Sequence, residues 1–230
     1  MLRASDRPGR GPHTKPDRQG RRSVEYWKHA MASGSRGWRL MDLWSLTGGL
    51  SLARMRPILE VVGASHLAEI DDIVAGCSGP AVPGGAEKVA SLRSWRSEIG
   101  ALEDSSDPSY FFQSTAAGVA ILVASQELPS DDREWRIRSS VGNFWDSCDD
   151  LLQVGGGYLR AEFQGIKTTL RGVEDIWREG DLRLLSEEGA DVAELYAERL
   201  SKIRLSYPKR RQIARVVAEC AEWNTPTISP

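Results

Sequence analysis

"SDDREWRIRSSVGNFWDSCDDLLQ", from Ser130 to Gln153, is the stretch that decides the fold, because it has a clear helical periodicity. At 100° per residue its apolar side chains fall within an arc of about 120°, the width of a stripe that faces a core. Those side chains are Ile137, Val141, Phe144, Trp145, Cys148, Leu151 and Leu152. The stretch therefore predicts a long amphipathic helix that packs on one side.

Helical patterns also account for most of the remaining chain, and no stretch shows the alternation of a strand. The expected helices are Val24–Ala32, one near Leu40–Trp44 that stops at Gly48 and Gly49, one that kinks or restarts at Pro57, one capped by Ser65 and ending at Gly76, Ala86–Leu102, Pro108–Glu127, Ser130–Gln153, Tyr158–Arg178, Asp191–Leu205 and Pro208–Trp223. Short connections between them favour an all-α fold, a single multi-helix domain of about seven to nine helices arranged as antiparallel helical hairpins. We expect the eight tryptophans to lie mainly in its core.

The helix after Ser130–Gln153 is expected to form one of these hairpins. Its apolar residues are spaced three and four apart, as in a packed seam: Leu159, Phe163, Ile166, Leu170, Val173 and Trp177. Val154–Gly157 would then be the turn. Because a helix precedes these glycines and no Lys-Ser/Thr follows, a phosphate-binding loop is disfavoured.

Composition divides the chain into three parts. Residues 1–22 are rich in Gly, Pro and Arg and carry +5, so we expect a disordered basic tail. Residues 23–225 form the expected helical domain and 226–230 a flexible C-terminus. Since the whole chain carries −2, the part after the tail carries −7. The tail either has no role of its own, which we favour, or contacts nucleic acid or a partner.

Cysteine usage and hydropathy favour a cytoplasmic protein. The three cysteines, Cys77, Cys148 and Cys220, have no metal-ligand spacing and are expected to be reduced. The most apolar segment, Ser114–Ser125, is shorter than the roughly 20 residues of a membrane-spanning helix and predicts a buried core helix. No apolar signal segment follows the arginines at the end of the tail. We therefore expect no membrane partner. Separately, the preference for Arg over Lys is typical of a GC-rich bacterial genome.

Asp146, Asp149 and Asp150 are the first candidate binding residues. They fall opposite the apolar stripe, at spacings that place them on one helix face. They also lie near a helix C-terminus, where the dipole disfavours negative charge. The acids therefore meet either an internal cation, for which Arg160, Lys167 and Arg171 are the candidates, or a basic partner or metal.

Catalytic and cofactor motifs are missing from the sequence. The aspartate pairs lack the DDxxD pattern of Mg²⁺-diphosphate enzymes, and no Glu-x-x-His pairs point to a di-iron bundle. Neither a GxSxG elbow nor a Cys/His nucleophile pattern occurs. We predict no catalytic residue, no metal ligand and no cofactor, and keep a metal-dependent helical-bundle enzyme at Asp149 and Asp150 as an alternative.

The stretch Arg199–Arg215 holds seven basic residues and no acid. Its candidate phosphate-contacting residues are Arg204, Lys209, Arg210 and Arg211. The competing interpretation is a solvated corner that pairs with the acids between Glu187 and Glu198. A nucleic-acid-binding or regulatory protein is therefore the second hypothesis.

The layout of Asp107–Leu152, an aromatic-led, Ala-rich helix, an acidic break and a helix with Trp and Asp, resembles helical bacterial proteins. These include YjaG-like proteins and actinobacterial proteins presumed to be immunity proteins of toxins. The resemblance implies a non-enzymatic protein that binds and blocks a partner. Our leading hypothesis is a protein-binding protein whose acidic helix face meets a basic toxin, since complementary charge speeds association.

Overall fold

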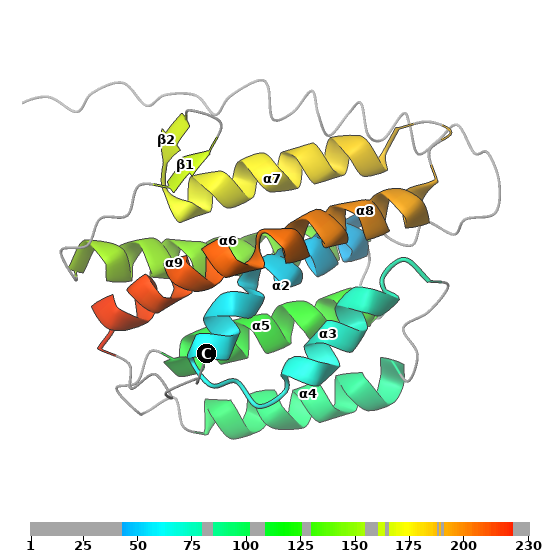
Figure 1. Ribbon diagram of the computed structural model, residues 1–230. Helices are drawn as coiled ribbons and strands as arrows, with labels where there is room; N and C mark the ends of the chain where they lie inside the picture. The colour runs from blue at the N-terminus through cyan, green and yellow to red at the C-terminus, as the bar shows by residue number, and fades with distance from the viewer. Residues whose placement is uncertain are drawn as a thin grey trace, which may run out of the picture. The chain divides into compact units, whose positions relative to one another are not determined.

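The computed structural model describes residues 43–79, 85–101, 109–125, 130–154, 161–163, 166–187, 189 and 191–222. All of them belong to one compact unit, Arg39–Pro230. The described part contains eight helices: α2 (Leu43–Val61), α3 (Leu67–Gly76), α4 (Gly85–Gly100), α5 (Ser109–Ala124), α6 (Ser130–Val154), α7 (Leu170–Leu185), α8 (Val192–Leu205) and α9 (Tyr207–Cys220). A short hairpin of β1 (Ala161–Phe163) and β2 (Ile166–Thr168) precedes α7 (Figure 1). The all-α prediction is confirmed. None of the described helices combines the length and apolarity that crossing a membrane requires.

Helix α2 is the centre of this bundle. It packs against α3, α5, α6, α7, α8 and α9, whereas α4 reaches the bundle through α3 and α5 (Figure 1). Fourteen of its 19 residues are buried, as expected of a helix that is apolar on nearly all sides. The core around it is mainly aliphatic, and Phe112 of α5 meets Phe144 of α6 edge to face at 5.0 Å.

The prediction that a helix stops at Gly48 and Gly49 is wrong, because α2 continues through both glycines and through Pro57. The glycines are places of close packing. A Cβ on Gly48 would lie 2.7 Å from Cγ2 of Val123, and a Cβ on Gly49 2.6 Å from the hydroxyl of Tyr196. Only residues without a side chain let α5 and α8 approach α2 this closely.

Helix α6 confirms the amphipathic prediction. Every member of the predicted stripe is buried except Leu151, which is half-buried. Helices α3, α4, α5, α8 and α9 also lie where they were expected, with ends shifted by a few residues. The residue before α3 is His66, whose side chain accepts no amide bond, so the predicted cap at Ser65 is wrong. The predicted helix Val24–Ala32, the tail 1–22, Pro108 and residues 226–230 lie outside the described residues.

The predicted helix Tyr158–Arg178 is wrong in its first half. Residues 161–163 and 166–168 pair as antiparallel strands, with Glu162 opposite Lys167. Helix α7 begins only after Thr169, an N-cap whose hydroxyl accepts a hydrogen bond from the amide of Gly172 at 3.1 Å. The glycines of the predicted turn lie outside the described residues.

The buried stripe of α7 also differs from the predicted seam, since Val173 and Trp177 are only half-buried. The stripe consists of Leu170, Glu174, Arg178, Asp181 and Leu185. Three of these five residues carry charge, so α7 turns its charged side toward the centre of the bundle.

Candidate functional site

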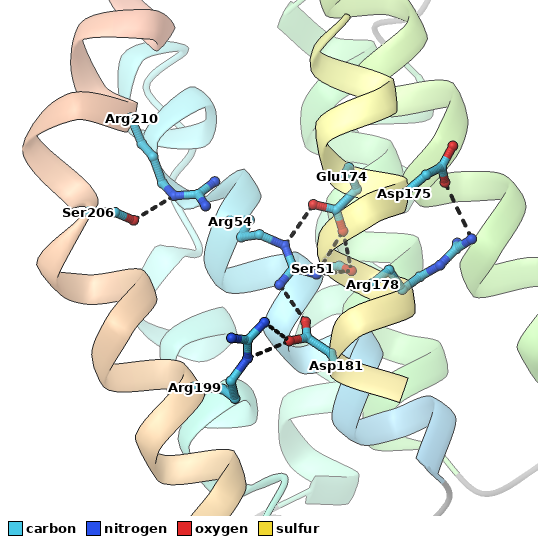
Figure 2. Close-up of polar contacts among 9 residues, drawn as sticks. All are labelled: Ser51, Arg54, Glu174, Asp175, Arg178, Asp181, Arg199, Ser206 and Arg210. Atoms are coloured by element: carbon cyan, nitrogen blue, oxygen red, sulfur yellow. Dashed lines mark hydrogen bonds and ion pairs between the residues drawn. The ribbon is translucent and has the colours of Figure 1, made fainter. Parts of the chain in front are cut away.

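A buried cluster of charged side chains joins α2, α7 and α8 (Figure 2). At its centre is Arg54 of α2, whose side chain is fully buried. Glu174 and Asp181 come from α7, two helical turns apart, and Arg199 comes from α8. We call these four residues, together with Ser51 of α2, the buried ion network.

Hydrogen bonds within the buried ion network are short and well matched. Arg54 donates from Nε and Nη2 to the two oxygens of Glu174, at 2.7 and 2.9 Å, and from Nη1 to Oδ2 of Asp181 at 2.7 Å. Ser51 donates to Oε1 of Glu174 at 2.7 Å. Arg199 donates from Nε to Oδ1 of Asp181 at 2.7 Å, and its Nη2 lies 2.6 Å from the same oxygen. Each carboxylate oxygen therefore has a cationic or hydroxyl donor.

The electrostatics of the network favour its charged form. Burial lowers the pKa of Arg54, but the attraction and hydrogen bonds of Glu174 and Asp181 outweigh this effect, so the pKa lies above its ordinary value. Two cations face two carboxylates, which makes the network neutral. Such an arrangement is stable when every partner is present and costly when one is removed.

Trp177 extends the network toward α9. The guanidinium of Arg199 lies 4.8 Å from the centre of this ring and that of Arg210 lies 5.8 Å from it. Arg210 also donates to the hydroxyl of Ser206 at 2.8 Å. Burial and the neighbouring Arg54 lower the pKa of Arg210. An arginine with this environment is still charged at neutral pH.

The chemistry of the network fits a structural joint. Its carboxylates are saturated by donors from the same chain, so none is directed toward a substrate. Among the described residues, no group of three or more His, Cys, Asp and Glu is placed to hold a metal ion. The sequence analysis does not predict the network. One signal for it is present, because Glu174, Arg178 and Asp181 lie at helical spacing between the apolar residues Leu170 and Leu185, on the face of α7 that is buried.

The structure separates the three predicted acids. Asp149 is buried, and its two oxygens accept hydrogen bonds from the amides of Leu170 at 2.9 Å and Arg171 at 3.0 Å. It therefore caps the N-terminus of α7, where negative charge is favourable. Burial raises the pKa of Asp149, against the opposing effect of these hydrogen bonds. The prediction of a three-residue exposed face is wrong for Asp149, which borders the apolar stripe.

The other two acids remain accessible to solvent. Asp146 is 58% exposed and lies 3.3 Å from Nη1 of Arg171, the partner expected from α7. Arg171 lies directly over Gly142, where any side chain would overlap its guanidinium. Asp150 is exposed, whereas Asp149 is directed toward α7, so the pair does not form a shared set of metal ligands. Arg160 and the side chain of Lys167 lie outside the described parts.

The predicted basic patch is divided in the same way. Arg204 and Lys209 are exposed. Arg210 is directed toward Trp177, and Arg211 lies 3.5 Å from Oε1 of Glu60 on α2. Of the predicted patch, Arg211 therefore contributes to the packing of α9 on α2, Arg210 faces Trp177 of α7, and the other two residues face solvent.

Three large apolar side chains of the described part are exposed. Leu205 at the end of α8 is 80% exposed, Trp135 of α6 is 68% exposed and Phe111 of α5 is 39% exposed. All three cysteines are free. Burial raises the pKa of Cys77 to about 12 and that of Cys148 well above its usual range, which makes both thiols unreactive.

Comparison with protein-family models, with curated proteins and with solved structures finds no match for this chain.

Proposed function

We propose that the protein is a non-catalytic binding protein that meets a protein partner through the outer face of α6. This outer face comprises Trp135, Arg136, Asn143, Asp146 and Asp150, all of them exposed. The observation that carries the proposal is the exposure of Trp135, whose large ring lies in solvent on this face. Tryptophan and arginine are enriched among the residues that dominate binding energy at protein interfaces.

Charge on this face favours a partner with a basic surface. Asp146 is only partly neutralised by Arg171, and Asp150 has no ion pair with a described residue. Two exposed carboxylates steer a positively charged protein toward the helix and speed its association. Because α6 packs against α2, α5, α7 and α9, the face is held rigid, which lowers the entropy lost on binding.

A bacterial, cytoplasmic immunity protein that blocks a basic toxin is the specific form of this proposal. Support comes from the resemblance of Asp107–Leu152 to helical immunity-type proteins, from the acidic balance of the chain after residue 22 and from the arginine-rich composition. Trp135 supplies the apolar anchor and the carboxylates supply the charge that a basic toxin complements.

The test compares variants of α6 in one capture experiment. Wild type, Trp135→Ala, the pair Asp146→Asn with Asp150→Asn, and the control Gln212→Ala, an exposed glutamine on α9, are immobilised and exposed to bacterial lysate at two salt concentrations. We expect a protein retained by wild type and Gln212→Ala to be lost with Trp135→Ala. With the aspartate pair its retention becomes weaker and less dependent on salt. Equal retention by all four folded variants would contradict the proposal.

The exposed corner between α8 and α9 supports a second candidate, a protein that binds nucleic acid. Arg204, Lys209 and Arg215 face solvent there and have no ion pair with a described residue. Retardation of random DNA or RNA at low salt, abolished by neutralising these three residues, would favour it over the outer face of α6.

A further inference from the structure

A groove on the opposite side of α6 from α7 runs over α5 between α4 and α6. Its volume is about 220 Å³ and it is half open to solvent. The lining residues are Arg96, Phe111, Ser114, Thr115, Gly118, Ser140 and Asn143. Neither the buried ion network nor the outer face of α6 includes the cation and the ring of this groove.

Every polar group that lines the groove can donate a hydrogen bond. Arg96 offers up to five N–H donors, Ser114, Thr115 and Ser140 each offer a hydroxyl, and Asn143 offers an amide. No carboxylate lies in the lining, although the chain as a whole is acidic. A groove with one cation and several neutral donors is complementary to an oxyanion.

Arg96 lies across α5 at the position of Gly118. A Cβ built on Gly118 would meet the guanidinium of Arg96 at 3.5 to 3.8 Å, and its three nearest neighbours all belong to that group. The backbone of α5 therefore forms the floor beneath the cation. No described residue forms an ion pair with Arg96, so its charge is available to a ligand.

Phe111 adds an aromatic surface to the rim of the groove. Its ring is 39% exposed and is fixed from behind by an edge contact with Phe112, at 5.5 Å between ring centres. A planar group bound beside Arg96 can stack on this ring, and such contacts contribute beyond the area that they bury.

We propose that the groove binds a small aromatic oxyanion, with its carboxylate or phosphate held by Arg96 and its ring placed beside Phe111. The groove has room for one ring and one anionic group, and its volume is smaller than that of the usual drug-sized site. An open groove of this size gives modest affinity, with a Kd on the order of 1 mM.

The experiment titrates the full chain with four probes: phenyl phosphate, benzoate, inorganic phosphate and phenol. Amide shifts of Gly118, Ser140 and Asn143 report binding. We expect both aromatic oxyanions to bind, inorganic phosphate to bind several-fold more weakly and phenol to leave the shifts unchanged. No saturable shift with phenyl phosphate or benzoate at about 20 mM, well above the expected Kd, would overturn the proposal.

Variants assign the two contacts. Arg96→Gln is expected to weaken both aromatic oxyanions at least tenfold, because hydrogen bonds to charged groups are worth about 1.5–3 kcal/mol. Arg183→Gln, an exposed arginine on α7, serves as the matched control and should bind as wild type does. Phe111→Leu should bring phenyl phosphate down to the affinity of inorganic phosphate. Unchanged binding by Arg96→Gln would overturn the anion site, and unchanged binding by Phe111→Leu would overturn its aromatic part.

A second variant tests the groove without altering its charge. Gly118→Leu places an aliphatic side chain on the floor beneath Arg96 and should abolish binding of the three anionic probes. Its folding is checked by circular dichroism, and since Arg96 and Phe111 are at the surface, their variants carry the test independently of this one.

Discussion

Helices α5 and α7 both pack on α2, but by different physical means. The buried face of α5 is largely apolar, with Phe112, Val119 and Val123 beside several alanines. The buried face of α7 carries Glu174, Arg178 and Asp181. Apolar burial is proportional to area and has no direction, whereas a buried ion network requires exact pairing. The apolar contact therefore depends on how closely the two surfaces pack, whereas the charged contact fixes one register of α7 on α2.

Removal of one carboxylate from the network should give the largest effect. Asp181→Ala leaves Arg54 with only Glu174 and leaves Arg199 unpaired, so we expect a loss of about 3–5 kcal/mol in the free energy of unfolding. Urea denaturation measures it. Glu179→Ala, which removes an exposed carboxylate of the same helix, is the matched control and should cost at most about 1 kcal/mol. Equal losses would mean that α7 is not held by the buried charges.

The apolar contact is tested by an added methyl group. Gly48→Ala brings a Cβ within 2.7 Å of Val123, whose branched side chain has little freedom in a helix, and within 3.3 Å of Ile137. Overpacking of this kind costs about 1–3 kcal/mol, measured as a lower midpoint of urea denaturation. A variant as stable as wild type would show that α2 and α5 can move apart freely.

The cap of α7 gives a smaller effect with a characteristic pH dependence. Asp149→Asn removes one of two accepted amide bonds and should cost about 0.5–2 kcal/mol near neutral pH. Burial raises the pKa of Asp149 in the folded protein, so the folded state binds this proton more tightly than the unfolded state. Its contribution to stability is therefore full at low pH and falls as the pH rises above about 4. The Asn variant should lack this fall.

Urea denaturation of wild type and Asp149→Asn from about pH 4 to about pH 7, the range above the ordinary carboxyl pKa, measures this difference. A difference in unfolding free energy that stays constant over the range would contradict the assignment of Asp149 as a buried cap.

Gly142→Ala should have the smallest effect. The added methyl displaces only the flexible end of Arg171, so the exposed pair with Asp146 is lost at a cost of at most about 1 kcal/mol. Replacement of a glycine inside a helix by alanine stabilises the folded state by about 0.5–1 kcal/mol. We expect a change within about 0.5 kcal/mol by urea denaturation, and a large loss would mean that Arg171 is as important to α7 as the buried ion network.

The contrast between α5 and α7 also explains which features the sequence predicts. The stripe of α6, the buried character of α5 and the bounds of α8 follow from periodicity and end signals, which depend on neighbouring residues. Arg54 lies more than 100 residues from both of its acidic partners, 120 positions from Glu174 and 127 from Asp181. Local patterns do not show which charges meet, so they indicate surface positions for Glu174 and Asp181.

The burial of some predicted binding residues was mispredicted for the same reason. Asp149 lies on the border of the apolar stripe of α6, and only the arrival of α7 decides that it is buried. Arg210 and Arg211 look like part of a continuous basic surface until α2 and α7 bring Glu60 and Trp177 beside them. Asp150 and Lys209 are exposed, as the sequence predicts, because no described helix covers them.

A double-mutant cycle of Arg54→Met and Glu174→Gln tests the central claim, that α7 is held on α2 by paired buried charges. Each single variant leaves a buried group without its partner, whereas the double variant removes both sides of the contact and leaves Asp181 with Arg199. If the account is correct, the double variant is more stable than the sum of the single losses predicts, by about 2 kcal/mol or more. Losses that add within about 0.5 kcal/mol would contradict it.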